Sequence, residues 1–215
     1  MAASTANLLL VEGATDLIAI AELAEGNGIP WPRDNEPIDI KTLDTNTPKK
    51  SVIEVFRKRT GLRSMGIVLD ADDGVQQTWI RVRSWFSHIP NFPEYVPEAG
   101  YVSDFRLPGL RLGVWIMPDN RSAGTLETLL KRMVRVEADA VLNHAIAATN
   151  DSKRLGAPFK KVHAEKAHIF TWLAWQDEPG RNLKTIDFGS LFDPKSACAQ
   201  PFICWLQNLF DIQTS

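Results

Sequence analysis

The chain has 215 residues, and its 24 Lys and Arg against 26 Asp and Glu give a formal net charge of −2. Hydrophobic residues make up 44% and charged residues 23%, which excludes disordered, collagen-like and coiled-coil chains and predicts one domain, at most with an appendage. The near-neutral charge excludes a protein held on nucleic acid mainly by overall positive charge, but leaves a local basic groove open.

The cysteines and the N-terminal residues favour a cytoplasmic protein. Cys198 and Cys204 are too few for a zinc cluster of four thiolates and argue against a disulfide scaffold. Residues 1–13 have no basic region before one short apolar run, so we expect no secretion signal. We also expect no membrane span, because no run of about 18 apolar residues occurs.

Short apolar runs alternate with helical periodicity in the first part of the chain. The run at residues 8–11 is apolar at every position, which predicts a strand buried on both faces. The expected elements are strands over 8–11, 38–43 and 65–69 and helices over 15–24, 51–59 and about 75–88. This alternation predicts an α/β fold with a mainly parallel sheet.

Residues 89–110 interrupt the alternation. Four prolines and the lack of a regular period indicate an insertion, in which 101–107 is predicted as an added strand. Beyond it we expect a fourth buried strand over 112–117, a helix from about Thr125, further helices over 133–148, 161–175 and 202–210, and a polar, basic connector over 151–160. The prediction is a four-stranded sheet flanked by helices. Residues 1–150 form its core, and 151–215 form a helical extension on the same domain.

Acidic residues follow three of the predicted strands. They are Glu12 and Asp16 near the end of the first strand, Asp70 and Asp72 after the third, and Asp119 and Glu127 after the fourth. The carboxyl ends of parallel strands share one edge of a sheet, where ligands bind in α/β folds. In extended chain the side chains of Asp70 and Asp72 point the same way, so they can share or bridge hard cations.

Convergence of these carboxylates favours a metal site. Helix capping or a solvated loop explains each acid alone, and this is the alternative interpretation. Like charges that converge, however, cost free energy unless a cation neutralises them. Mg²⁺ or Mn²⁺ would do so through oxygen ligands. Asp73 and Asp119 are additional candidate ligands.

Two motifs resemble the Toprim domain of topoisomerases, primases and the overcoming-lysogenisation-defect (OLD) nucleases. Residues 10–16 (LVEGATD) and 69–72 (LDAD) match its glutamate after the first strand and its Asp-x-Asp after the third. Residues 122–127 (SAGTLE) resemble the Gly-x-x-Glu region of OLD-like nucleases, and 114–120 (VWIMPDN) is typical of small stand-alone Toprim proteins related to them. The resemblance covers about 7–150 and implies a Rossmann-like Toprim fold.

The resemblance implies a metal-dependent phosphodiester hydrolase, a nuclease acting on DNA or RNA with two Mg²⁺ or Mn²⁺ ions about 3.5–4 Å apart. It implies that Glu12 is an acid/base or a metal ligand, that Asp70 and Asp72 hold the metal, and that Asp16 and Glu127 serve the second ion. The chain lacks the G-x-x-x-x-G-K-[ST] motif, so control by NTP hydrolysis would need a partner such as an ATPase. An effector in antiviral defence is one setting that the resemblance suggests. The alternative is a non-catalytic or partner-activated binding or regulatory module.

Lys166 lies in the apolar stripe of the predicted 161–175 helix. A lysine there either extends to solvent or reaches a polar pocket. OLD-like nucleases carry a lysine on a late helix that contacts the scissile phosphate, so the resemblance implies a catalytic Lys166. Lys160 and Lys161 predict a basic rim for a phosphate backbone, against the alternative of a solvated charge run. Two nearby histidines, His163 and His168, do not share a helix face and are interpreted as ordinary solvated residues. Homo-oligomerisation stays open.

Overall fold

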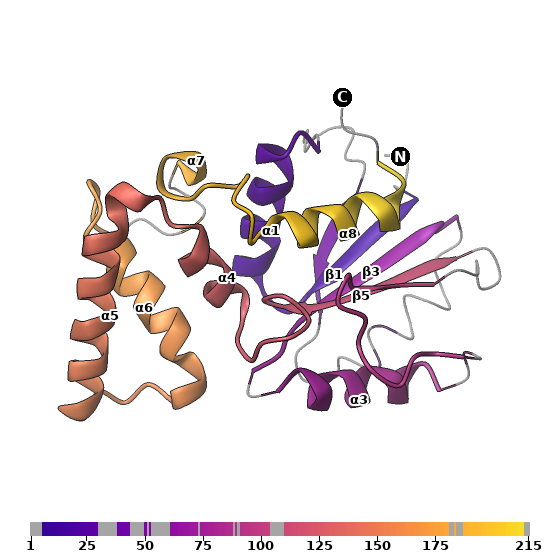
Figure 1. Ribbon diagram of the computed structural model, residues 1–215, viewed down its shortest axis with the longest axis horizontal. Coiled ribbons are helices and arrows are strands. Elements are labelled where there is room, and N and C mark those ends of the chain that lie inside the picture. The colour runs from indigo at the N-terminus through magenta and orange to yellow at the C-terminus, as the bar shows by residue number, and fades with distance from the viewer. Residues whose placement is uncertain are drawn as a thin grey trace.

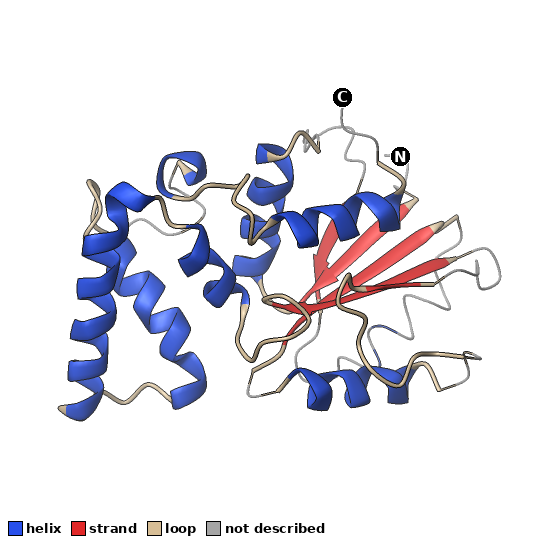
Figure 2. Cartoon of the chain, viewed as in Figure 1, coloured by secondary structure: helices blue, strands red, loops and turns tan. Residues whose placement is uncertain are grey.

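In the computed structural model the described residues are 6–29, 38–43, 50, 52, 61–72, 74–87, 89, 91–103, 110–180, 183 and 187–212. They form a five-stranded sheet in the order β2-β1-β3-β5-β4, with helices on both faces (Figures 1 and 2). The strands are β1 (Asn7–Val11), β2 (Asp39–Thr42), β3 (Ser64–Asp70), β4 (Tyr101–Val102) and β5 (Arg111–Met117). The mainly parallel α/β fold is therefore confirmed.

The four strands predicted from apolar runs pair in parallel, and the insertion adds a fifth. Strand β4 pairs antiparallel with β5 through Tyr101 and Val102. The prediction of an added strand from residue 101 is thus confirmed for its first two residues, and this strand extends the predicted four-stranded sheet to five. The rest of the expected 101–107 strand, beyond Ser103, lies outside the described residues, as does most of the helix expected over 51–59.

The central strands are buried on both faces, as their continuous apolar runs predict. Leu9 and Val11 of β1 join the cluster on one face, whereas Leu8 and Leu10 join the cluster on the other. Successive side chains of a strand point to opposite faces, so only a run of apolar residues satisfies both layers. The sheet is consequently a rigid platform whose carboxyl edge carries the acidic residues.

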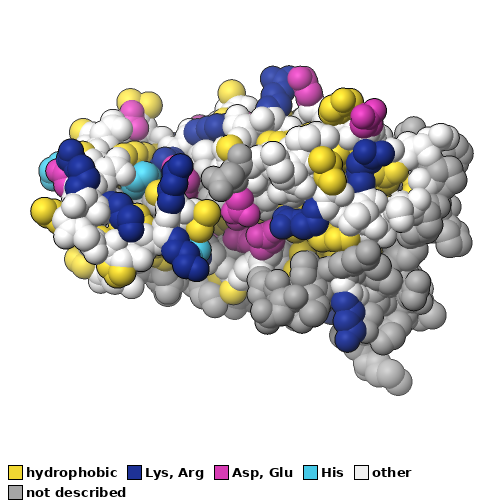
Figure 3. All heavy atoms as spheres, turned by 90° about the horizontal axis from the view of Figure 1, so that it is seen from below, with side chains coloured by type: hydrophobic (Ala, Val, Ile, Leu, Met, Phe, Trp, Pro, Cys, Tyr) yellow, Lys and Arg dark blue, Asp and Glu magenta, His cyan; other side chains and the backbone are white. Residues whose placement is uncertain are grey.

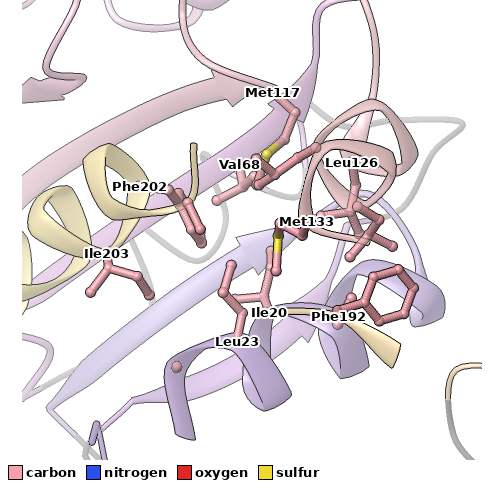
Figure 4. Close-up of a cluster of buried hydrophobic side chains, with 14 of the residues drawn as sticks. Ile20, Leu23, Val68, Met117, Leu126, Met133, Phe192, Phe202 and Ile203 are labelled. Atoms are coloured by element: carbon pink, nitrogen blue, oxygen red, sulfur yellow. The ribbon is translucent and has the colours of Figure 1, made fainter. Parts of the chain in front are cut away.

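Three helices that contact the sheet contribute to the first cluster, part of which Figure 4 shows, and the helices described below add further residues to it. The three are α1 (Ala14–Gly26), α4 (Leu126–Met133) and α8 (Gln200–Phe210). Helix α8 lies close to the sheet because Gly66 and Gly113 are paired across β3 and β5. A Cβ atom on Gly66 or Gly113 would lie 2.9 or 2.5 Å from the side chain of Leu209.

The opposite face is covered by α3 (Val75–Trp85), whose Trp79, Val82 and Trp85 are buried. Helix α3 stops short of the expected end at residue 88, because the chain leaves the helix at Phe86, whose φ and ψ are −113° and 25°. Figure 1 shows α3 on one side of the sheet, with α1 and α8 on the other. Within the described residues, no helix is both long and apolar enough to cross a membrane.

The remaining helices form an antiparallel pair beside the sheet (Figure 1). They are α5 (Asp139–Arg154) and α6 (Ala164–Leu173), preceded by the 3₁₀ turns Val136–Ala138 and Lys161–His163, and the short α7 (Phe188–Leu191) follows them. The prediction of a helix over 133–148 was wrong at both ends. Val134 instead turns extended and pairs with Phe192, so α5 begins later and runs into the predicted connector.

Candidate active site

The order of the strands places a crevice between β1 and β3. From β1 the chain continues to β2 on one side, and from β3 it continues to β5 on the other. At such a switch point the connections diverge to opposite faces, and ligands of α/β proteins bind beyond the carboxyl ends of these strands. Glu12 directly follows β1, and Asp70 ends β3. The two residues therefore stand at the place where this topology puts a site.

A cavity of about 370 Å³ lies at this point, and we call it the acidic cavity. It is lined by Glu12, Gly13, Ala14, Thr15, Asp16, Asp70, Asp72, Thr125, Glu127, Val162, His163 and Lys166. The structure thus brings together all five predicted metal ligands and the predicted catalytic lysine. Figure 3 shows acidic side chains gathered near the middle of one face of the molecule, with Lys and Arg side chains on either side.

Two of the acids come from the turn between β1 and α1. The Asp16 carboxylate accepts a hydrogen bond from the Gly13 amide at 2.8 Å, which closes the first turn of α1. Burial raises the pKa of Asp16 to about 6, although the Gly13 bond opposes the rise. Burial, followed by the charge of Asp72, raises the pKa of Glu12 to about 7. Arg81 offsets part of this, with its Nη2 atom 4.0 Å from Glu12 Oε1.

Asp70 joins β3 to the start of α4, because its Oδ1 accepts the Leu126 amide at 3.0 Å. Burial comes first among the causes that raise the pKa of Asp70 to about 9, and the charges of Glu12, Asp16 and Glu127 add to it. At neutral pH the ion-free chain therefore keeps a proton on Asp70. An additional positive charge in the cavity would be needed to hold all of these carboxylates ionised.

Asp72 reaches the cavity by a route that the sequence did not predict. Its φ of 49° is left-handed, so the argument that Asp70 and Asp72 point the same way in an extended chain was wrong. The Asp72 backbone instead exchanges hydrogen bonds of 3.0 and 2.9 Å with Gly124. This bridge ties the turn after β3 to the loop before α4, and both Asp70 and Asp72 line the cavity.

Glu127 and Lys166 lie close together in the lining of the acidic cavity. Glu127 in α4 is 5% exposed, and its Oε2 accepts the Thr125 hydroxyl at 2.9 Å. The Lys166 Nζ atom in α6 lies 4.0 Å from Glu127 Oε1, while the lysine side chain remains 53% exposed. The Lys166 ammonium is therefore available to a ligand from solvent while a buried carboxylate lies beside it.

A polar network behind the cavity holds α6 against α4. Glu165 pairs with Lys131 at 2.6 Å and accepts the Thr128 hydroxyl at 3.3 Å. His168 is buried, with its Nε2 3.2 Å from Asn150 Oδ1, so the expectation of a solvated histidine was wrong there. Burial, followed by the charge of Lys131, lowers the pKa of His168. The network fixes the helix that carries Lys166.

The additional candidates lie elsewhere. Asp119 does not line the acidic cavity: its carboxylate pairs with Arg132 at 2.6 Å and accepts the Ser122 amide at 2.7 Å. Burial would raise the pKa of Asp119, but these bonds outweigh burial and lower it. Asp73 is outside the described residues. Lys160 and Lys161 are exposed and directly precede Val162, which lines the cavity. Neither lysine lines the cavity itself.

Thr125 and Arg81 near the acids were missed in the sequence, and His163 was noted there only as a solvated residue. Thr125 caps α4 and binds Glu127, and its place before an acidic first turn was a usable signal. His163 lines the cavity beside the first turn of α6. Arg81 approaches Glu12 from α3. No local sequence pattern could have indicated this contact, because the two residues are distant in the chain and meet only in the tertiary structure.

The donor set suits a hard cation. Carboxylate oxygens are the ligands that Mg²⁺ and Mn²⁺ take in proteins. Among the residues that the structure describes, no three Asp, Glu, His or Cys side chains already stand in a ligating arrangement. Burial and neighbouring acids raise the pKa values of Glu12, Asp16 and Asp70, so the ionised forms of these carboxyl groups are unfavourable. A divalent ion bound among them would favour the ionised forms.

Comparison with known proteins places the chain in one family. The family described as "Protein of unknown function (DUF3226)" matches residues 6–211, and the chain belongs to it. The match spans all five strands and every residue that lines the acidic cavity. No curated protein and no solved structure matches the chain.

Proposed function

We propose that this DUF3226 protein is a metal-dependent phosphodiester hydrolase, a Toprim-like nuclease that acts on DNA or RNA. The observation that carries the proposal is the convergence of five carboxylates and one exposed lysine on a single cavity at the switch point of the sheet. A cavity so acidic repels a phosphate unless cations intervene, and with cations it binds one. The resemblance of the 10–16 and 69–72 motifs to Toprim nucleases supports the same chemistry.

Mg²⁺ or Mn²⁺ would be held by Glu12, Asp70 and Asp72, and a second ion by Asp16 and Glu127. Such ions stabilise the negative charge that develops on the attacking and leaving oxygens of a phosphodiester. The protein's part is to hold these carboxylates close together, which the hydrogen bonds to Gly13, Leu126 and Thr125 do.

Lys166 would bind and orient the scissile phosphate. Its ammonium offers three donors to a non-bridging oxygen, and its place at the exposed side of the cavity lets a phosphate approach from solvent. The bond from the water oxygen to phosphorus forms as the ester P–O bond breaks. Glu12 accepts one proton of the water and then gives it up to the leaving oxygen, so that the products are a phosphomonoester and a free hydroxyl and Glu12 is regenerated.

Cleavage assays test the proposal directly. The purified chain is incubated with single- and double-stranded DNA and RNA in Mg²⁺, in Mn²⁺ and in EDTA. We expect cleavage in the presence of either ion, none in EDTA and none by the Asp70→Asn variant. Asp119→Asn is the matched control, since it neutralises an aspartate that also follows a strand but lies outside the acidic cavity.

The competing proposal is a non-catalytic or partner-activated module, with an ATPase or another protein as the partner. Binding of nucleic acid by the wild type without cleavage in either ion would favour this role. Cleavage that survives in EDTA or in Asp70→Asn would contradict the metal site itself.

A further inference from the structure

A second cavity, of about 290 Å³, adjoins the acidic cavity, and we call it the arginine cavity. It is lined by Ala71, Asp72, Gly74, Gln77, Thr78 and Arg81. Asp72 lines both cavities, so the two are neighbours along one surface. The volume is about ten times the ~30 Å³ that one water molecule occupies in the liquid, and a hydrated phosphate group fits within it.

The arginine cavity is held in a fixed position relative to the acidic one. Thr78 is buried, and its hydroxyl donates to the carbonyl oxygen of Asp70 at 3.3 Å. Asp70 in turn lines the acidic cavity. Gln77 and Arg81 are four residues apart on α3 and therefore share one helix face. Both side chains therefore line the arginine cavity from the same face of α3.

Arg81 is suited to an anion from solvent. Its side chain is 46% exposed, and its Nη2 lies 4.0 Å from Glu12 Oε1, which is too far for a hydrogen bond. A guanidinium carries five N–H donors in a plane that matches the oxygens of a phosphate. The Glu12 carboxylate keeps the guanidinium beside the acidic cavity without engaging its donors.

The charges are arranged with acids in the middle and one cation at each end. Lys166 lines the acidic cavity, and Arg81 lines the arginine cavity on the other side of the shared Asp72. Figure 3 shows the same pattern, with basic side chains on both sides of the acidic group. One cationic side chain beside the carboxylates is enough to bind a single phosphate. A second cationic side chain beyond Asp72 can bind a second phosphate of the same ligand.

We propose that the arginine cavity binds a neighbouring phosphate of the same strand, so that the substrate is a polynucleotide that crosses the acidic cavity and is cut at internal phosphodiesters. This inference rests on the proposed function and deepens it. Hydrolysis then consumes one water per cut and leaves one phosphomonoester end and one hydroxyl end. No free end is required, because the scissile phosphate and the neighbouring phosphate are both held by side chains at the surface.

The test compares Arg81→Gln with the wild type on two substrates. One is single-stranded DNA or RNA in linear and covalently closed circular form. The other is bis(p-nitrophenyl) phosphate, a phosphodiester with no neighbouring phosphate. Arg83→Gln is the matched control, because it removes the same charge from the same helix but lines neither cavity.

We expect circles to be cut as readily as linear strands. Arg81→Gln should raise the half-saturating concentration of polynucleotide by about tenfold, as loss of a charged hydrogen bond does, with the maximal rate little changed. The slope of log affinity against log salt should fall in magnitude by about 0.7, the value for one lost phosphate contact on a single strand. Hydrolysis of bis(p-nitrophenyl) phosphate should change much less than cleavage of polynucleotide, by no more than the effect of the lost Arg81 charge on Glu12. Arg83→Gln should match the wild type throughout.

Three outcomes overturn the inference, and they are distinguishable from failure of the proposed function. If circles resist cleavage while linear strands are cut, the enzyme needs an end and the crossing strand is wrong. If Arg81→Gln lowers activity equally on both substrates, Arg81 has a structural role. If its polynucleotide affinity and salt slope equal those of the wild type, the arginine cavity binds no phosphate. Wild-type protein that hydrolyses neither substrate in Mg²⁺ or Mn²⁺ removes the proposed function and the inference together.

Discussion

Asp70 and Asp119 occupy similar places in the chain and opposite electrostatic environments. The strands that precede them, β3 and β5, are adjacent and parallel. Burial and neighbouring carboxylates raise the pKa of Asp70 to about 9. Burial acts on Asp119 as well, but the Arg132 ion pair and the Ser122 hydrogen bonds outweigh it and lower the pKa of Asp119.

The difference indicates which strand-end acids are free for chemistry. The folded chain supplies Asp119 with its own cation, so this residue stabilises a turn. Asp70 receives one backbone hydrogen bond and faces three other acids, so the folded chain favours its protonated form. A position at the end of a strand therefore does not define the site, whereas uncompensated charge does.

The largest expected difference between the two aspartates is in cleavage activity. Asp70→Asn should lower cation-dependent cleavage by about 10² or more, because it removes a ligand of the ion that stabilises the transition state. Asp119→Asn should keep cleavage within about threefold, since a surface ion pair contributes little. Single-turnover cleavage by the two variants measures the contrast. Equal losses would mean that the acidic cavity is not the reaction centre.

Lys166→Met tests the cation that the acidic cavity does possess. The substitution keeps the length of the side chain and removes its charge, so cleavage should fall by about 10², the scale for one lost contact to transition-state charge. Mg²⁺ affinity should hold, because lysine is not an Mg²⁺ ligand. The melting temperature should hold, since the Lys166 side chain is 53% exposed and methionine keeps the apolar contact with the Phe170 ring. Unchanged cleavage would remove Lys166 from the site.

Stability should change in opposite directions at the two aspartates. In EDTA, Asp70→Asn should raise the free energy of unfolding by about 0.5–2 kcal/mol. On folding, the buried carboxyl must either take up a proton or keep its charge beside other acids, and the neutral amide does neither. Asp119→Ala should lower it by about 1 kcal/mol, because the Ser122 amide loses its acceptor. Chemical denaturation of both variants measures this. Mg²⁺ should stabilise the wild type more than Asp70→Asn, by linkage to ligand binding.

The smallest effect concerns pH. The raised pKa values of about 6, 7 and 9 for Asp16, Glu12 and Asp70 mean that the folded, ion-free chain holds protons that the unfolded chain releases. Stability in EDTA should therefore fall as pH rises from about 5 to about 8. Asp70→Asn should flatten this decline. The lowered pKa of Asp119 acts at the other end, because its contribution is present above about pH 4 and lost in more acidic solution.

Equilibrium unfolding at several pH values, with Asp119→Asn beside Asp70→Asn, separates the two contributions. A wild-type stability that rises between pH 5 and 8 in EDTA would show that the acids of the cavity are already compensated by the chain.

The sequence by itself determined the strands and the acids at their ends. Runs such as 8–11 and 112–117 are apolar at every position, so they form buried strands wherever they lie, and the residues after them fall at one edge of a parallel sheet. The periodicity of residues 161–175 likewise predicted most of α6 and placed Lys166 on it. These features depend on neighbours within a few residues, which the sequence displays directly.

Only the tertiary structure decided which acids share a cavity and which cations meet them. Asp72 enters through a left-handed turn bridged to Gly124, and Arg81 reaches Glu12 from a helix about 70 residues away in the chain. Asp119 pairs with Arg132 after α4 has folded back towards the end of β5. Each outcome depends on a contact between separate elements. The pKa of a carboxyl group follows from burial and from charges within a few ångströms, and these are properties of the packed chain rather than of its local sequence.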